Sequence, residues 1–303
     1  MSDSKYYLPE PSHWPLVGSI GLFVTTFGFA FALLNYNAPV EEGGGTIGNL
    51  MVMYIGMAII AFMMFGWFGT VIRESEAGKY NAQVDTSFRM GMMWFIFSEV
   101  MFFAAFFGAL FYIRQLSIPW LAGEGNNAMT NELLWPSFDG GWASDGKAMV
   151  SPNPEAYPTP TAVVGAWGIP LLNTILLIAS SFTCTFAHHA LKKDARSKMV
   201  TWMIITLALG FTFLGFQIYE YSHAINDLGL TLSSGTYGST FYMLTGFHGA
   251  HVTIGAIMLT IMTLRMIKGH FTPKNHFAFE AAAWYWHFVD VVWVGLFIFV
   301  YVL

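Results

Sequence analysis

The stretch WFIFSEVMFFAAFF, residues 94–107, is apolar except for Ser98 and the carboxylate of Glu99. A charge at the centre of a lipid bilayer costs at least about 2.5 kcal/mol, so an acid there is neutral, paired or in contact with water. Two hypotheses follow. Glu99 takes up or relays protons, or it is a protonated carboxyl that donates a hydrogen bond to a neighbouring helix.

Further polar side chains interrupt other apolar stretches. His248 and His251 are three residues apart, as are His287 and Asp290, so each pair shares one face of a helix. Histidine is the commonest metal ligand, and a haem or copper site is one hypothesis. Hydrogen bonding between helices accounts for most histidines within membrane spans and is the favoured explanation of these groups, together with Glu220. Because no HExxH or CxxC pattern completes a ligand set, we expect a polar network and no metal site.

The pair His188–His189 ends one apolar stretch beside Lys192 and Lys193. This position favours an anchor at the membrane surface over a pair of metal ligands. Cys184 is the single cysteine, so neither an intrachain disulfide nor a cysteine metal cluster can form.

The elements that position these groups are membrane-spanning helices. Of the 303 residues, 55% are hydrophobic and 10% are charged, against about a quarter charged in a soluble domain. A helix needs roughly 20 apolar residues to cross the hydrocarbon layer. We predict an all-α integral membrane protein that forms a single domain over residues 1–303, with seven helices at about 16–35, 50–72, 88–113, 162–187, 199–223, 238–266 and 281–302. Glu99 would lie about 16 Å from the inner end of its span, near the midplane.

The positive-inside rule predicts the orientation. With a cytoplasmic N-terminus and a C-terminus outside, all but two of the 13 Lys and Arg residues fall inside; Arg114 and Lys147 are the exceptions. The outside segments include a long loop, residues 114–161, whose Gly, Asn, Pro and Trp content predicts an irregular structure. The opening segment has neither a signal-peptide nor a transit-peptide pattern.

Cationic and aromatic residues gather at the inner ends of two spans: Trp67 and Arg73 on one, and Arg265, Lys268 and His270 on the other. Snorkelling of long side chains toward the headgroups explains them. A specific phospholipid site between helices is the sharper hypothesis.

Several sequence blocks resemble subunit III of the haem-copper cytochrome c oxidases. They are VIRE (71–74), SEVMFF (98–103), PLLNT (170–174), AHH (187–189), YGSTFYMLTGFHGAHV (237–252) and HFAFEAAAWYWHFVDVVW (276–293). The resemblance implies seven transmembrane helices, with the first two splayed from helices three to seven around a lipid-filled, V-shaped cleft. It also implies an accessory subunit without a redox centre.

In such a complex, subunit I carries haems and copper, subunit II carries copper, and electrons pass from cytochrome c to oxygen with proton pumping. The resemblance implies that this chain stabilises subunit I, protects it during turnover and supports its proton uptake. Glu99 matches the family's carbodiimide-reactive membrane glutamate. Positions that match residues near bound phospholipid headgroups are Trp67, Arg73, Glu74, Arg265 and His270. We expect no nucleic-acid partner.

The chain departs from the mitochondrial pattern in places. Phe68 stands where a second tryptophan is expected, and Lys79 and Tyr80 replace a histidine-containing turn, which leaves the bound lipid open. The longer loop after the third helix favours a bacterial plasma membrane over the mitochondrial inner membrane.

Other functions stay open from sequence. Subunit III of a quinol oxidase commonly lacks the first two helices, which are present here. A proton-coupled transporter could use Glu99, Glu220 and Asp290, although no matched pair of broken helices appears. A haem-carrying subunit could use His248, His251 or His287.

Overall fold

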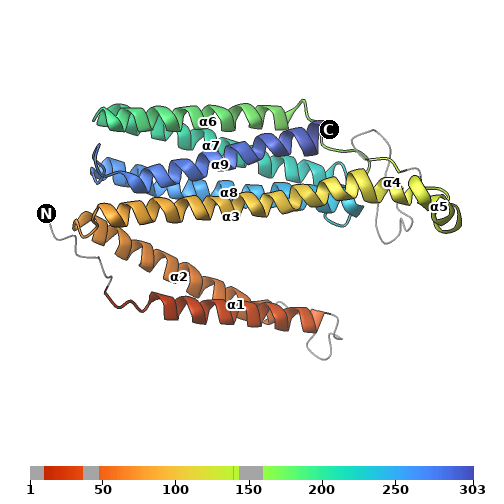
Figure 1. Cartoon of the computed structure of the whole chain (residues 1–303), viewed down its shortest axis with the longest axis horizontal. Helices are drawn as coiled ribbons and strands as arrows, with labels where there is room; N and C mark the ends of the chain where they lie inside the picture. The colour runs from red at the N-terminus through yellow and green to blue at the C-terminus, as the bar shows by residue number, and fades with distance from the viewer. Residues whose placement is uncertain (1–9, 37–47, 139, 143–159) are drawn as a thin grey trace. The chain divides into compact units, whose positions relative to one another are not determined.

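The computed structural model describes residues 10–36, 48–138, 140–142 and 160–303, and the secondary structure of these residues is helical throughout (Figure 1). The long helices are α1 Trp14–Tyr36, α2 Gly48–Glu76, α3 Ala82–Tyr112, α6 Ile169–Lys192, α7 Arg196–Asn226, α8 Gly235–Lys268 and α9 Phe277–Leu296. Two short helices, α4 Ile118–Leu121 and α5 Ala128–Leu134, follow α3.

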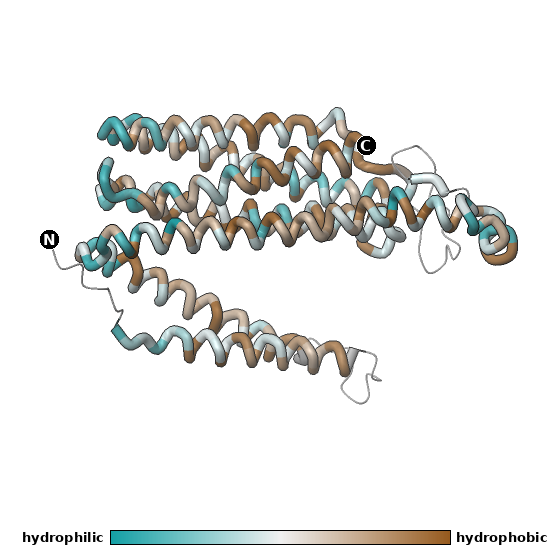
Figure 2. Tube along the Cα trace, in the orientation of Figure 1, coloured by the Kyte–Doolittle hydropathy of each residue, from teal (hydrophilic) through white to brown (hydrophobic). Residues whose placement is uncertain are grey.

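The prediction of an all-α chain with seven spans is confirmed: seven helices of the described residues are long and apolar enough to cross a membrane. Each predicted span falls on one of these helices, with ends that differ by a few residues. Figure 2 shows hydrophobic residues along the helices and hydrophilic residues gathered at one end of α6 and of α9. Backbone polar groups within a bilayer must be satisfied internally, and a helix does so within one segment.

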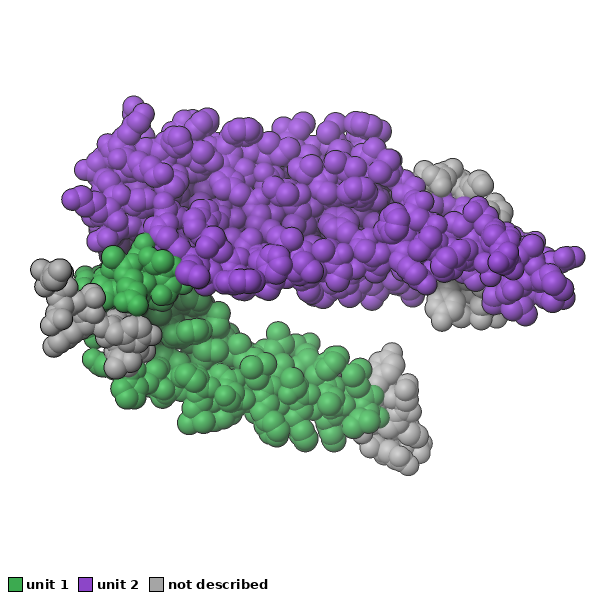
Figure 3. Space-filling model, in the orientation of Figure 1, with its two compact units in different colours: residues 1–88 green, residues 89–303 purple. Residues whose placement is uncertain are grey.

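The chain divides into two compact units, residues 1–88 and 89–303 (Figure 3). The single domain over residues 1–303 stays a prediction. In unit 1, α1 and α2 pack closely through glycines. A Cβ at Gly56 would collide with the backbone of Thr25, and one at Gly28 would collide with the backbone of Met53. Small residues let the backbones of membrane helices approach. These glycines therefore set the register of the pair.

Unit 2 contains the rest of α3 and the helices α6 to α9, of which α7 packs against α6 and α8, and α9 against α6 and α8. Trp286 of α9 is buried between Gly210 of α7 and Gly255 of α8, and its indole N–H donates to Ser180 Oγ of α6 at 2.9 Å. Trp293 donates to Thr174 Oγ1 in the same way, also at 2.9 Å. The two tryptophans thus join α9 to α6 with their polar atoms satisfied.

The predicted irregular loop of residues 114–161 differs from the structure in its first half. The chain continues from α3 through a π-helical turn, Ile113–Ser117, into α4, a 3-10 turn, Gly125–Asn127, and α5. Pro119 fits because it lies in the first turn of α4, where its missing N–H is not needed. Positive φ angles at Gly123 and Gly125 reverse the chain after α4. Residues 143–159 lie outside the described residues.

Candidate functional site in the membrane bundle

Glu99 on α3 is paired with His251 on α8. Glu99 Oε2 lies 2.8 Å from His251 Nε2, and the two side chains are 22% and 13% exposed. A weaker contact of 3.5 Å joins the Ser98 hydroxyl to Glu99 Oε1. Glu99 thus has a partner on a neighbouring helix, and both the charged and the neutral form of its carboxyl fit this contact.

The partners of His251 define where protons lie. Its Nδ1 is 2.6 Å from the carbonyl oxygen of Phe247, which can only accept, so Nδ1 carries a hydrogen. At 2.8 Å, Nε2 and Glu99 Oε2 would repel each other if both presented lone pairs, so a proton lies between them. It belongs either to an imidazolium facing a carboxylate or to a carboxylic acid facing a neutral imidazole. Both forms have the same net charge, and the pair holds one exchangeable proton.

Aromatic rings surround this pair. The rings of Phe102 and Phe103 lie 5.8 and 5.0 Å from the imidazole of His251, and the ring of Tyr285 is stacked 6.4 Å from it. An apolar environment strengthens the interaction between the two partners because it lowers the local dielectric constant.

His248 and His251 do not share a site, although they lie on the same helix. His248 is fully buried, donates from Nε2 to the Val289 carbonyl at 3.1 Å, and packs 5.0 Å from the ring of Trp293. It therefore links α8 to α9, whereas His251 faces α3. The membrane histidines of the haem hypothesis, including His287, do not converge into a group close enough for a metal within the described residues.

Glu220 of α7 forms a separate buried cluster. It is 1% exposed and accepts a hydrogen bond of 2.6 Å from the Tyr301 hydroxyl, with the buried Gln217 one helical turn away on α7. This hydrogen bond joins α7 to the π-helical turn Phe297–Val302, which continues α9 and contains Tyr301.

His287 and Asp290 lie on one face of α9, as their spacing predicted, and this face meets α6. His287 Nε2 lies 3.4 Å from the Thr185 hydroxyl, and Asp290 faces Ser181. The residues of the predicted polar network therefore make separate contacts between helices rather than one connected site.

Comparison with known proteins identifies the family of this chain. The sequence matches the family cytochrome c oxidase subunit III over residues 4–122 and 148–303. Relatives named cytochrome c oxidase subunit 3 include those of Marchantia polymorpha, 40% identical over 98% of this chain and 95% of the relative, and of Pongo abelii, 37% identical over 98% and 96%. The chain belongs to the cytochrome c oxidase subunit III family. The Glu99–His251 pair is therefore a feature of a respiratory oxidase subunit.

The phospholipid-binding candidates of this subunit III lie in both units. In unit 1, Trp67 is half-exposed, Arg73 donates to the Thr70 hydroxyl at 3.2 Å, and Glu74 accepts a 2.8 Å hydrogen bond from Tyr80. Tyr80 is one of the positions that depart from the mitochondrial pattern, and here it orients Glu74.

In unit 2, Arg265 is 8% exposed and its guanidinium lies 4.6 Å from the centre of the Phe271 ring. The backbone N–H of His270 donates to the Arg265 carbonyl at 3.1 Å in the turn that ends α8 at Gly269. Arg265 thus does not extend outward as a snorkelling side chain does. Headgroup binding stays a prediction for both sets.

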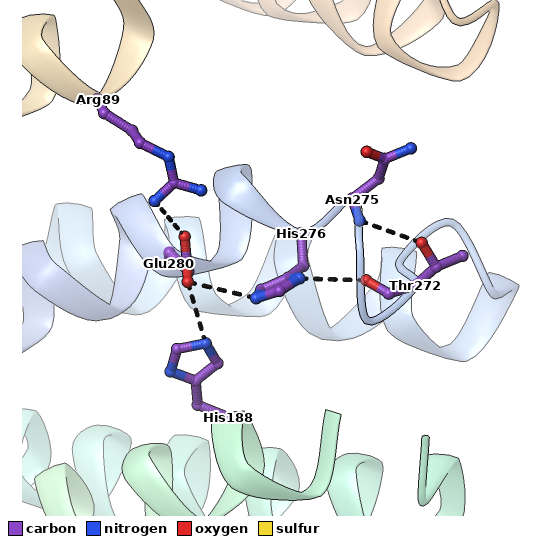
Figure 4. Close-up of polar contacts among 6 residues, drawn as sticks. All are labelled: Arg89, His188, Thr272, Asn275, His276 and Glu280. Carbon is purple, nitrogen blue, oxygen red and sulfur yellow. Dashed lines mark hydrogen bonds and ion pairs between the residues drawn. The ribbon is translucent and has the colours of Figure 1, made fainter. Parts of the chain in front are cut away.

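A cluster that the sequence did not predict lies at the end of the bundle formed by the last turn of α6 and the first turn of α9 (Figure 4). Arg89 Nη1 is 2.6 Å from Glu280 Oε2, and the Nε2 atoms of His188 and His276 are each 3.3 Å from Glu280 Oε1. The spacing of His276 and Glu280, four residues apart, was a visible signal. Nothing local in the sequence joined them to His188 or Arg89, because those contacts connect distant helices.

Proposed function

We propose that the chain is an accessory subunit of a proton-pumping respiratory oxidase that passes electrons from cytochrome c to oxygen. In this proposal it stabilises subunit I, which holds haems and copper, contacts subunit II with its copper, and carries no redox centre itself. Membership of the subunit III family over nearly the whole chain supports it. The presence of α1 and α2 favours cytochrome c over quinol as the donor.

The proposed orientation places the N-terminus in the cytoplasm and the C-terminus in the periplasm of a bacterial plasma membrane; the alternative is the mitochondrial inner membrane. The cationic residues at the α6–α7 turn, Lys192, Lys193, Arg196 and Lys198, support the inner assignment of that end. An alkaline-phosphatase fusion after residue 303 tests it. Activity of the fusion is expected, and an inactive but expressed fusion would reverse the orientation.

Glu99 is proposed to support proton uptake by the catalytic partner. The observation that carries this role is the 2.8 Å contact with His251, since that contact holds an exchangeable proton at membrane depth. Within the pair the proton can pass between oxygen and nitrogen at constant net charge, and its transfer toward the catalytic partner would leave the pair one unit more negative until another proton replaced it. A purely structural hydrogen bond between Glu99 and His251 would show the same contact. The test must therefore remove the acid proton and keep the hydrogen bond.

The Glu99→Gln variant of the assembled oxidase makes this separation. The glutamine amide can donate to His251 Nε2 and so retain the contact, but it has no exchangeable acid proton. We expect oxygen consumption close to the unmodified complex at low pH, and an earlier decline as pH rises and proton supply becomes limiting. Steady-state turnover against pH, with subunit content measured on the same samples, is the measurement.

Ser98→Ala is the matched control because it removes the weak 3.5 Å contact to Glu99 and leaves the pair intact. Its pH profile should coincide with that of the unmodified complex. If Glu99→Gln also gives that profile at full subunit content, Glu99 has a structural role alone.

A further inference from the structure

Three ligand atoms of the kinds that zinc prefers converge at the end of unit 2. The Nε2 atoms of His188 and His276 each lie 3.3 Å from Glu280 Oε1, and all three atoms are within 4.8 Å of one another. Neighbouring ligands of a tetrahedral ion with bonds of about 2.0–2.1 Å are about 3.3 Å apart, so two of the three edges already match.

The two contacts to Glu280 lack the geometry of hydrogen bonds, because both Nε2 atoms are buried without a hydrogen-bond partner among the described residues. The ring nitrogens are near the carboxylate oxygen, at the distance of an ion pair, without a hydrogen bond to it. This arrangement differs from that of Glu99 and His251, which do form a hydrogen bond. The Nε2 atoms of the two histidines therefore need a binding partner other than the Glu280 carboxylate.

The surroundings prepare His276 and Glu280 as ligands. His276 Nδ1 lies 3.1 Å from the Thr272 carbonyl, which can only accept, so Nδ1 carries a hydrogen, and in the neutral ring the lone pair of Nε2 faces the cluster. The Asn275 N–H donates to the Thr272 hydroxyl at 3.1 Å and stabilises that turn. Metal-bound histidines commonly donate their other N–H to a carbonyl in this way.

Arg89 fixes the carboxylate. Its Nη1 binds Glu280 Oε2 at 2.6 Å, which leaves Oε1 facing the two histidines (Figure 4). The side chains of His188, His276 and Glu280 are 20%, 9% and 12% exposed, so the cluster is sheltered but reachable from the aqueous end of the bundle.

We propose that His188, His276 and Glu280 bind a divalent cation of the zinc class and thereby clasp α6 to α9. Imidazole and carboxylate suit such an ion, whereas magnesium and calcium prefer oxygen ligands alone. Three protein ligands leave a fourth position for water. The cations that face the cluster are Arg89 from α3 and Lys192 from the end of α6. They weaken binding without blocking it, because Arg89 occupies the other carboxylate oxygen.

The test is zinc binding by the purified oxidase complex that contains this chain. After chelator treatment, equilibrium dialysis against Zn²⁺ with metal analysis gives the number and affinity of bound ions. The unmodified complex should bind one ion more than the His188→Ala and His276→Ala complexes. The affinity at this site should fall by at least about 100-fold, since loss of an outer-shell partner alone commonly costs about 10- to 100-fold.

His189→Ala is the matched control, because His189 is the exposed neighbour of His188 and lies outside the cluster. It should bind zinc as the unmodified complex does. Zinc sites in other subunits contribute equally to every sample and cancel in the difference. Glu280→Gln provides a second route if a histidine variant fails to assemble. Equal zinc content in all assembled variants would overturn the proposal and leave an ion-pair network.

Discussion

In unit 1, two helices meet backbone to backbone, whereas in unit 2 the helices meet through large side chains and buried polar groups. At the α1–α2 contact, Gly56 and Gly28 have the backbones of Thr25 and Met53 as neighbours, and Gly66 lies against the ring of Trp14. Gly255 in unit 2 instead faces the ring of Trp286, and a Cβ added there would lie 2.9 Å from Cε3 of that ring. Of the most apolar window in each span, 6% is buried in α2 and 50% in the last span.

This difference shows two ways to hold helices together where lipid supplies no hydrophobic drive. Close backbone approach gains dispersion contacts and needs no polar residue, so the outward side chains of α1 and α2 are free to be apolar and exposed, as Phe23, Phe27 and Phe65 are. The helices of unit 2 also form side-chain hydrogen bonds, and these determine which side chains contact each other. Substitutions should therefore destabilise the two units for different reasons: steric collision with the backbone in unit 1, and loss of side-chain contacts in unit 2.

The largest effect is expected for Gly56→Leu in unit 1. The new side chain would meet the backbone of Thr25, which cannot move aside as a side chain can. Overpacking usually costs about 1–3 kcal/mol, and a backbone obstacle places this change at or above that range. Thermal unfolding of the subunit within the detergent-solubilised complex, together with its retention there, measures the loss.

Gly69→Leu is the control on the same helix, because a Cβ at Gly69 would have no atom within 4 Å beyond its chain neighbours and the nearby backbone of its own helix. It should behave like the unmodified chain. If both substitutions are tolerated equally, glycine contact does not hold α1 to α2.

The sequence predicted the helices well because a membrane span is a local property: about 20 apolar residues between polar ends suffice. The structure of the segment after α3 was harder to predict from the sequence. Residues 128–134 form α5, yet their polar and apolar composition between glycines and asparagines resembled that of a loop. Short helices depend on contacts that composition does not encode.

The sequence predicted which residues of the candidate site matter, but it did not predict which of them contact one another. Glu99 and His251 were both singled out, but 152 positions separate them, and only the packing of α3 against α8 joins them. Arg89 and Glu280 are 191 positions apart and gave no signal of their own. Intramembrane polarity thus identifies which groups need a partner, whereas the fold decides which partner each receives.

A smaller effect should separate the lipid candidates of the two units. Arg73 is exposed and can snorkel, whereas Arg265 is buried over Phe271. If Arg265 and His270 bind an anionic or zwitterionic headgroup, Arg265→Gln should lower the phospholipid retained by the purified complex more than Arg73→Gln does. Quantitative lipid mass spectrometry at equal subunit content is the measurement. Unchanged lipid in Arg265→Gln would assign Arg265 to packing alone.

The smallest effect is expected at the hydrogen bond between Trp286 and Ser180, which is characteristic of the bundle. Ser180→Ala removes the acceptor of the 2.9 Å bond from the indole N–H, and neither residue can reach water because both are buried. Hydrogen bonds between membrane helices average only about 0.6 kcal/mol, with a maximum near 1.7, because partners are also found in the unfolded state. A double-mutant cycle of Ser180→Ala with Trp286→Phe isolates the coupling energy. A coupling of about 0.6 kcal/mol would show that side-chain hydrogen bonds select the partner in unit 2 while packing supplies most of the stability. A coupling above about 2 kcal/mol would mean that polar contacts hold the bundle, and the contrast with unit 1 would then be one of energy as well as of specificity.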